Sequence, residues 1–346
     1  YTDLVIRQSM YKHRDPNNRR LNDSVYLKAA EEGLYGNNVK KTISLQFYPE
    51  GGKLVIGKKS RVAVMAVDDS GFPYQSDGHV MNAAGDVVAN FKTDSLGRGS
   101  FFVVPDGGPC TVQMRNKKND IGQSVQLFDM PKAEKEGCVL ALDAVSDDML
   151  ATLQCSDGMS GCMLGCVIMN NGNIVYCDTM SAEPLIEIAL DRSRQRAGVN
   201  QFTVFDSNGR ILAERLYFVC PPKDSECSIS FTAEVGSIRP CGRVCVDVRS
   251  LPKSTLSLSA MDATAMTNGS VGSMKTWMLL SSDVRGYIDN VNFYFEEDDY
   301  CHRQAADLLM LTQGWRRYDW EVMCGVERMS EFRQAEDKFY VKGKLG

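Results

Sequence analysis

Short apolar runs bounded by turn residues fill the first part of this chain. Runs of about 4–8 residues that alternate or stay apolar are typical of β-strands. Such runs occupy residues 42–48, 60–67, 87–92, 99–104, 111–114 and 124–128. Turn residues such as Gly51-Gly52 and Gly107-Gly108 separate them. This spacing predicts an antiparallel β-sandwich over residues 43–130.

A charged segment without periodicity, residues 131–137, predicts a linker, and the strand pattern restarts after it. The second set of predicted strands covers residues 138–144, 149–154, 163–169, 173–177, 185–189, 201–205 and 211–219. Asn171-Gly172 and Asn208-Gly209 lie between apolar runs, and Asn-Gly readily adopts positive φ at both turn centres, so two tight hairpins are expected. The polar segment 191–198 fits a loop or one helical turn. A second sandwich is therefore predicted over residues 138–220.

A second linker, residues 221–227, begins with Pro221-Pro222, and strands are predicted after it at 228–235, 243–248, 256–261 and 278–280. One amphipathic helix is predicted from 300 to 311, where apolar side chains such as Ala305 and Leu309 share a face. Asp298 or Asp299 is expected to cap its amino end, and Gly314 to stop it.

The predicted fold is therefore all-β, with three tandem antiparallel β-sandwich domains and one short helix near the carboxyl end of the third. The third domain is expected to span residues 228–337. Residues 1–42 are interpreted as a lead-in with partial upstream strands, and residues 338–346 as the start of a following domain. Both ends are expected to be cut from a longer protein.

Composition narrows the possible partners. Apolar residues make up 43% of the 346 residues, enough for several cores. The net charge of −5 disfavours a nucleic-acid partner, which would need a basic face. No apolar run approaches the roughly 20 residues of a membrane helix, so no transmembrane segment is predicted.

The chain has 12 cysteines, and most lie inside apolar, strand-like runs. They are interpreted either as buried free thiols or as including one or more disulfides, with Cys220 and Cys227 as the best candidate pair. The pairs Cys162-x3-Cys166 and Cys241-x3-Cys245 could supply metal ligands. Residues four apart on a strand lie about 13 Å apart, too far for one zinc ion. No metal and no cofactor are predicted.

Catalytic constellations are not evident in the sequence. The three histidines, His13, His79 and His302, lie in no nucleophile motif, and His302 is expected on the exposed side of a helix start. The acidic run 296–299 could supply calcium ligands, but a helix cap with a solvated loop is favoured. The prediction is that the chain is not an enzyme.

Aromatic and arginine residues gather near the carboxyl end. Because both types are enriched at interface hot spots, the segment 315–320 is interpreted either as core packing or as a partner surface. The candidate partner surface comprises Tyr287, Tyr294, Trp315, Arg316, Arg317 and Tyr318.

Three groups of strings carry a resemblance to a known family. The first comprises residues 47–52, 60–63 and 93–101; the second, 198–205, 208–209 and 213–215; the third, 279–283, 286–288 and 307–316. They resemble the macroglobulin-type, immunoglobulin-like β-sandwich domains of large bacterial envelope proteins. A carboxypeptidase-regulatory-like sandwich and a TonB-receptor plug domain often follow such domains. No string here matches the Cys-Gln thioester of protease-capturing macroglobulins.

The resemblance implies an exported protein of the Gram-negative envelope, periplasmic or associated with the outer membrane. Its implied partners are other domains of the same larger chain and an outer-membrane β-barrel receptor. The leading hypothesis is a non-enzymatic structural and interaction module linked to TonB-dependent uptake. The alternative is a module that grips a peptide, a protease or a glycan through the aromatic region at residues 287–320. A third hypothesis is an enzyme whose carboxylates are brought together by the fold.

Overall fold

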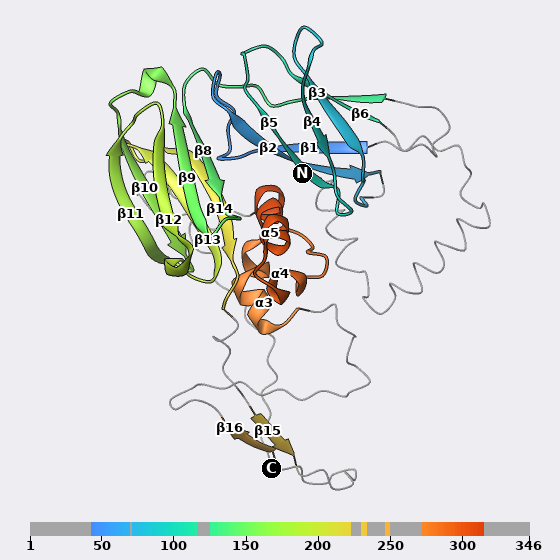
Figure 1. Ribbon diagram of the computed structural model, residues 1–346, viewed down its shortest axis with the longest axis vertical. Coiled ribbons are helices and arrows are strands. Elements are labelled where there is room, and N and C mark those ends of the chain that lie inside the picture. Colours follow the sequence, from blue (N-terminus) through green and yellow to red (C-terminus); the bar gives the residue numbers. More distant parts are fainter. Residues whose placement is uncertain are drawn as a thin grey trace, which may run out of the picture.

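Two β-sandwiches and a group of short helices make up most of the described chain (Figure 1). The computed structural model describes residues 43–69, 71–115, 125–222, 230–233, 246–249 and 272–314. All named strand pairs in these ranges are antiparallel. The predicted β class, built from antiparallel sandwiches, is therefore confirmed.

The first sandwich has one sheet of three strands and one of four. The three-stranded sheet has the order β1 (Ile43–Pro49), β2 (Ser60–Asp68), β5 (Arg98–Val103). The four-stranded sheet has the order β4 (Val87–Lys92), β3 (Asp77–Met81), β6 (Thr111–Arg115), β7 (Val125–Asp129). Alternate side chains such as Val62 and Val64 of β2 point inward and are fully buried against Val80 and Val112 of the other sheet. These residues recur with the period of 2 expected of a strand, although Ala63 on the opposite face is buried as well.

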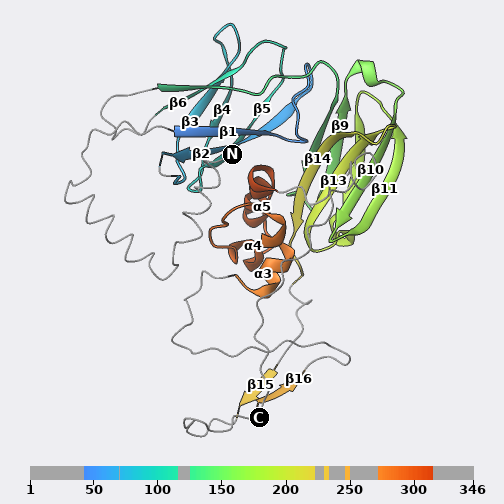
Figure 2. The same cartoon turned by 180° about the vertical axis from the view of Figure 1, so that it is seen from behind.

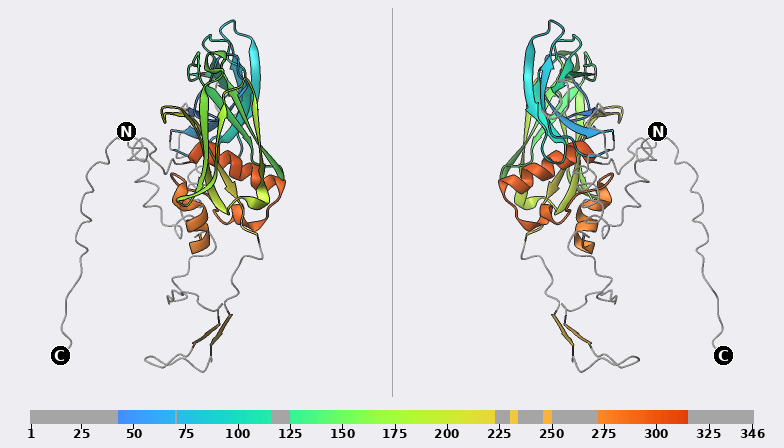
Figure 3. Two further views of the ribbon diagram at one scale, coloured as in Figure 1. Left: turned by 90° about the vertical axis from the view of Figure 1, so that its left-hand side faces the viewer. Right: turned by 90° about the vertical axis from the view of Figure 1, so that its right-hand side faces the viewer.

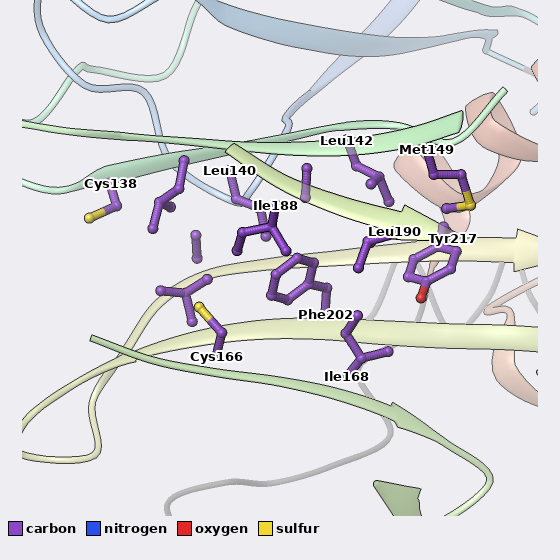
Figure 4. Close-up of a cluster of buried hydrophobic side chains, with 14 of the residues drawn as sticks. Cys138, Leu140, Leu142, Met149, Cys166, Ile168, Ile188, Leu190, Phe202 and Tyr217 are labelled. Atoms are coloured by element: carbon purple, nitrogen blue, oxygen red, sulfur yellow. The ribbon is translucent and has the colours of Figure 1, made fainter. Parts of the chain in front are cut away.

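The second sandwich repeats this plan. Its three-stranded sheet has the order β12 (Ile186–Asp191), β9 (Asp148–Cys155), β8 (Cys138–Asp143). Its four-stranded sheet has the order β11 (Asn173–Ser181), β10 (Met163–Asn170), β13 (Gly198–Asp206), β14 (Ile211–Val219). Short 3-10 turns lie at Asp157–Met159 and Arg192–Arg194, and the second resolves the polar segment 191–198 as one helical turn. Figure 4 shows Leu140 and Ile188 of one sheet facing Phe202 of the other across the core.

The two predicted Asn-Gly hairpins differ in their turns. Asn171 and Gly172 have φ of 47° and 77°, which is the predicted two-residue turn between β10 and β11. At the second site only Gly209 has positive φ, at 78°, so that prediction was wrong in its turn type. The reason is Asp206, whose Oδ1 accepts from the backbone N–H groups of Asn208 and Arg210 and holds a longer turn.

The helical group begins at α3 (Met274–Leu279), followed by a 3-10 turn at Ser281–Asp283, α4 (Phe293–Glu296) and α5 (Tyr300–Gln313). Helix α5 confirms the prediction of a helix at 300–311, and Asp299 caps it by accepting from His302 N–H at 2.9 Å. The predicted strand at 278–280 is wrong, since residues 278 and 279 belong to α3. Ser273 caps α3, and its Oγ accepts from Thr276 N–H at 3.2 Å.

The hairpin formed by β15 (Ser230–Ala233) and β16 (Val246–Arg249) overlaps two predicted strands of the third domain. The predicted strand at 256–261, the lead-in 1–42 and the start of a following domain at 338–346 lie outside the described residues. The extent of a third sandwich over 228–337 stays a prediction. The described part of that range is mainly helical, with three helices rather than one.

Helix α5 lies between the two sandwiches, as views from four sides show (Figures 1, 2 and 3). The helical group covers the outer face of β13 and β14, where Leu216 and Phe218 pack against Leu280 and Leu309. The predicted linker 131–137 also docks, because Glu134 N–H donates to Leu54 O at 2.8 Å. These contacts bring the two sandwiches and the helices together around α5.

Candidate functional site

Four charged side chains meet where the two sandwiches and helix α5 touch. Asp307 of α5 accepts from Arg61 Nη1 of β2 at 2.6 Å, and its other oxygen accepts from Arg215 Nη2 of β14. Arg215 Nε donates to Glu50 Oε1 at 2.7 Å, and Glu50 directly follows β1. We call Glu50, Arg61, Arg215 and Asp307 the junction network. It joins one residue of α5 to both sandwiches.

The junction network is buried and balanced in charge. Relative exposure is 2% for Glu50, 3% for Arg215 and 2% for Asp307, and the Arg61 side chain is 17% exposed, so water screens these charges only weakly. Burial alone would lower the pKa of Arg215, but the Asp307 and Glu50 carboxylates outweigh it and raise that pKa above its usual range. Two arginines therefore face two carboxylates in a low-dielectric site, where each charge depends on its partners.

The backbones of the two sandwiches lie close together beside the junction network. Glu50 Oε1 also accepts from the backbone N–H of Leu142 in β8 at 3.1 Å. Gly51, with φ of 79°, forms a bridge with Glu214, and a Cβ at this position would lie 2.9 Å from the backbone N of Leu140. Glycine is required here both for the positive φ and for the close approach of the two sandwiches.

The carboxyl end of α5 is anchored to the first sandwich by Arg98, a residue that is 5% exposed. Arg98 Nη1 donates to Tyr294 Oη at 3.1 Å, and its Nη2 donates to Gln313 Oε1. Gln313 Nε2 in turn donates to the backbone oxygens of Arg285 and Tyr287, each at 3.1 Å. Gln313 thus links β5 to the loop before α4.

Gly314 ends α5, as predicted, but in an unexpected way. Its φ is −56°, so it is not the left-handed stop that glycine usually provides. A Cβ on Gly314 would lie 2.5 Å from Met310 O and 2.7 Å from Leu216 Cδ1. Space, rather than backbone conformation, therefore requires glycine where the helix passes over β14.

The amino end of α5 is anchored to the second sandwich by Arg303. Its Nη1 donates to Asp147 Oδ1 at 2.7 Å and to Val145 O at 3.1 Å, and its Nε donates to Asp298 Oδ1 at 2.7 Å. The hydrogen bond from Arg303 holds the pKa of Asp298 below its usual range. Both carboxylates are substantially exposed, so this anchor is weaker than the junction network.

A cavity of about 330 Å³ opens beside the junction network. Its polar lining includes Glu50, Gln201, Glu214 and Arg215, and Met310 is among its apolar residues. Gln201 Nε2 donates to Glu214 Oε1 at 2.8 Å, so part of this lining is already hydrogen-bonded within the second sandwich. The arrangement suits interdomain contact more than catalysis, because the charged groups point at one another.

The aromatic region is only partly as predicted. Tyr287 is 54% exposed, which suits a partner surface, but Tyr294 is 2% exposed, so its assignment to that surface was wrong. Tyr294 packs in the core of the helical group and accepts from Arg98. The other four members of the candidate surface lie outside the described residues; they are Trp315, Arg316, Arg317 and Tyr318.

His302 is half-buried rather than exposed, because its ring stacks on Phe293 at 4.4 Å between centroids and its Nδ1 lies 2.7 Å from Asp299 Oδ1. His79 Nδ1 lies 2.6 Å from Asn90 Oδ1 across β3 and β4, and His13 lies outside the described residues. In the described ranges, no group of three or more His, Cys, Asp or Glu side chains could hold a metal ion. No helix in those ranges is long and apolar enough to cross a membrane.

Sequence reasoning missed the junction network, although a signal was present. Arg215 lies inside the apolar run of β14, and Asp307 lies among the apolar residues of α5. A charge in such a position must find a partner or remain near water. All four members of the network also lie in the strings that carry the family resemblance.

No model of a known protein family matches the sequence, and no curated protein does. A solved structure of Escherichia coli alpha-2-macroglobulin spanning domains MG0-NIE-MG1 is 12% identical, with a TM-score of 0.22, and covers 65% of this chain and 81% of that one. The Yersinia pseudotuberculosis adhesin InvE is 8% identical, with a TM-score of 0.20, and covers 54% of this chain and 62% of that one. The BSP domain of a biofilm-associated protein is 17% identical, with a TM-score of 0.25, and covers 52% of this chain and 30% of that one. At such low TM-scores the β-sandwich class rests on the sheets described above.

Proposed function

We propose that this chain is a non-enzymatic structural and interaction module of a larger exported envelope protein linked to TonB-dependent uptake. In this role helix α5 holds the two sandwiches as one rigid body and so fixes the direction in which neighbouring domains leave it. The observation that supports the proposal is the carboxylate of Asp307, which binds Arg61 of one sandwich and Arg215 of the other.

The energetics of the junction network favour a role in orientation. Each sandwich has its own apolar core, so neither needs the network to bury its apolar residues. Taking two charges out of water offsets much of what their attraction gains, so a buried ion pair is weak support for stability alone. A different orientation of the sandwiches would leave buried charges without partners. The network therefore selects one orientation against the others.

The proposed location is the periplasm or the outer membrane, with other domains of the same chain and an outer-membrane β-barrel receptor as partners. The support is the family resemblance of the strings that contain Glu50, Arg61, Arg215 and Asp307. A module that orients domains must keep its two sandwiches in one fixed arrangement, which suits a multi-domain envelope protein.

The direct test is to measure the distance between the sandwiches when the network is broken. Spin labels carried by noncanonical amino acids at Val87 and Ile174 would report it by pulsed electron paramagnetic resonance. Both positions are exposed, one on each sandwich. In the parent chain we expect one narrow distance distribution. Asp307→Asn keeps the side-chain shape but removes the charge that Arg61 and Arg215 share, so the distribution is expected to broaden.

Asp157→Asn is the matched control. Asp157 forms an ion pair with Lys58 across the two sandwiches at 3.9 Å, but its side chain is 99% exposed. An exposed ion pair of this kind contributes little to the free energy that holds the sandwiches together, so Asp157→Asn should keep the narrow distance distribution. A parent distribution as broad as that of Asp307→Asn would mean that the sandwiches move freely, and it would overturn the proposal.

The second candidate function, a grip on a peptide, a protease or a glycan, is favoured by one observation. Tyr287 is 54% exposed and Trp277 of α3 is 59% exposed on the helical group. A photo-crosslinker placed at Tyr287 of the full-length protein in cells distinguishes the two functions. Capture of a β-barrel would favour the domain-orienting module, and capture of a soluble protease or glycan-bearing protein would favour the grip.

A further inference from the structure

Two buried cysteines face each other across neighbouring strands of the second sandwich. Cys138 of β8 and Cys155 of β9 are direct register partners. The adjacent pair is hydrogen-bonded, because Ser156 N–H donates to Gly137 O at 2.9 Å. Hydrogen-bonded and non-hydrogen-bonded pairs alternate along an antiparallel ladder, so the two cysteines occupy a non-hydrogen-bonded pair. In such pairs the Cα atoms are about 4.5 Å apart and the side chains are closest.

The two sulfur atoms are placed for bonding. Cys138 Sγ lies 2.9 Å from Cys155 Sγ, within about 1 Å of the disulfide bond length of about 2.05 Å. Disulfides have Cα separations of about 4.4–6.8 Å, a range that includes this type of pair. Both residues are 1% exposed in the core of the second sandwich, where Met159 Sδ lies 3.6 Å from Cys138 Sγ. Small side-chain rotations would therefore bring the sulfurs to bonding distance without moving the strands.

We propose that Cys138 and Cys155 form an intrachain disulfide when the protein folds in an oxidising compartment. The oxidant is a low-molecular-weight or protein disulfide. The thiolate of Cys155 attacks one of its sulfurs, which forms a mixed disulfide and releases one thiolate. Cys138 then gives up its proton and attacks Cys155 Sγ, which releases the second thiolate. Two thiols are oxidised to one disulfide, and the oxidant's disulfide is reduced to two thiols.

The surroundings support this division of roles. A hydrogen bond from Cys138 lowers the pKa of Cys155, and Lys58 adds to that effect, so Cys155 is the better thiolate. The same hydrogen bond and burial raise the pKa of Cys138. Because both sulfurs are covered in the complete sandwich, the exchange takes place during folding, once β8 and β9 have paired and while Cys155 is still open to the oxidant.

The disulfide would cross-link β8, the strand of the second sandwich that contacts the first sandwich. β8 carries Leu142, whose backbone N–H donates to Glu50, and Leu140, against which Gly51 packs. A cross-link at Cys138 fixes β8 to β9 beneath these contacts. The geometry of the pair is independent of the proposed function, which supplies only the oxidising compartment.

The other described cysteines provide an internal comparison. Cys166 is also fully buried in the same core, while Cys162 and Cys177 are exposed. None of these three is a register partner of another cysteine in the described sheets. The predicted partner of Cys220, Cys227, lies outside the described residues.

The test is disulfide mapping of the full chain. The reduced protein is unfolded, refolded in a buffer of reduced and oxidised glutathione, alkylated at acid pH and cut on the amino side of aspartate. Cys138 then lies in peptide 129–142, Cys155 in peptide 148–156, and Cys162, Cys166 and Cys177 together in peptide 157–177. We expect peptides 129–142 and 148–156 to be recovered joined, and to separate on reduction.

Recovery of both peptides in alkylated form, or of either joined to peptide 157–177, would overturn the proposal. Cys155→Ala should remove the joined species and leave Cys138 open to alkylation in the unfolded chain. Cys166→Ala removes a thiol from the same core and should leave the joined species unchanged. Because the oxidant is supplied in the tube, failure here says nothing against export, and failure of export leaves this result intact.

Discussion

The outer faces of the two four-stranded sheets differ in how far they are buried. In the first sandwich β7 alternates between exposed and half-buried residues, and Leu127 is 63% exposed. In the second sandwich the first eight of the nine residues of β13 are buried. Phe202 of β13 points into the sandwich core, while Val199 packs against the helical group. The difference shows that the helices give the second sandwich a third layer.

An antiparallel sheet usually leaves one face to water, which produces alternation along each strand. β13 and β14 depart from that rule because the helical group covers Val199, Leu216 and Phe218 on their outer face, while Phe205 packs against Met169 of the neighbouring strand. Continuous burial in an antiparallel strand is thus the mark of a further layer. In this chain the further layer also carries Asp307, so the covering helices and the junction network are one arrangement.

The largest expected effect comes from removing the charge at the centre of the covered face. Arg215→Leu would leave Glu50 and Asp307 buried without their main partner, which typically costs about 3–5 kcal/mol. Arg194→Leu, in an exposed pair with Asp191, should cost less than about 1 kcal/mol. Urea unfolding followed by circular dichroism measures both free energies. Equal losses for the two variants would contradict the comparison.

The next effect concerns apolar packing on the covered and open faces. Leu309→Ala removes a fully buried side chain between α5 and the sheet, and should lower the free energy of unfolding by about 2–5 kcal/mol. Leu127→Ala on the open face of β7 should change it by no more than about 0.5 kcal/mol. The same urea experiment compares them. A small loss at Leu309 would mean that the helices contribute little to the second sandwich.

The smallest effect is expected at the exposed anchor of α5. Asp298 has a lowered pKa because Arg303 donates to it, so its stabilising contribution is present above the unfolded pKa of about 3.9 and is lost as pH falls through the folded pKa. The difference in urea midpoint between the parent and Arg303→Gln should therefore shrink between about pH 5 and about pH 2. A difference that stays constant would assign the role of Arg303 to its bond with Val145 O.

Periodicity predicted most of the strands of both sandwiches because most of them bury one face in a local pattern. It missed β3, since Asp77, Gly78 and His79 show no apolar alternation. The ring of Phe91 lies over Gly78 and leaves no space for a larger side chain. The prediction of a strand at 278–280 failed because a three-residue apolar run does not distinguish a strand from a helix. The N-cap at Ser273 favours the helix.

The junction network could not be paired from sequence, because its bonds join residues far apart in the chain. Arg61 and Asp307 are 246 residues apart, and Glu50 and Arg215 are 165 apart. Charge inside an apolar run indicates that a partner is needed, but not which one. Only the packing of the two sandwiches and α5 against one another brings these four side chains together.

The separation of Arg215 from Asp307 by 92 residues sets an order of assembly. A chain is synthesised from its amino end, and domains generally fold as units in that order. Both sandwiches can therefore fold before Asp307 has been added, with Glu50 as the carboxylate partner of Arg215. Helix α5 docks last, so a chain that ends before it keeps the contacts of Glu50 and Gly51 with the second sandwich but lacks the carboxylate that binds both Arg61 and Arg215.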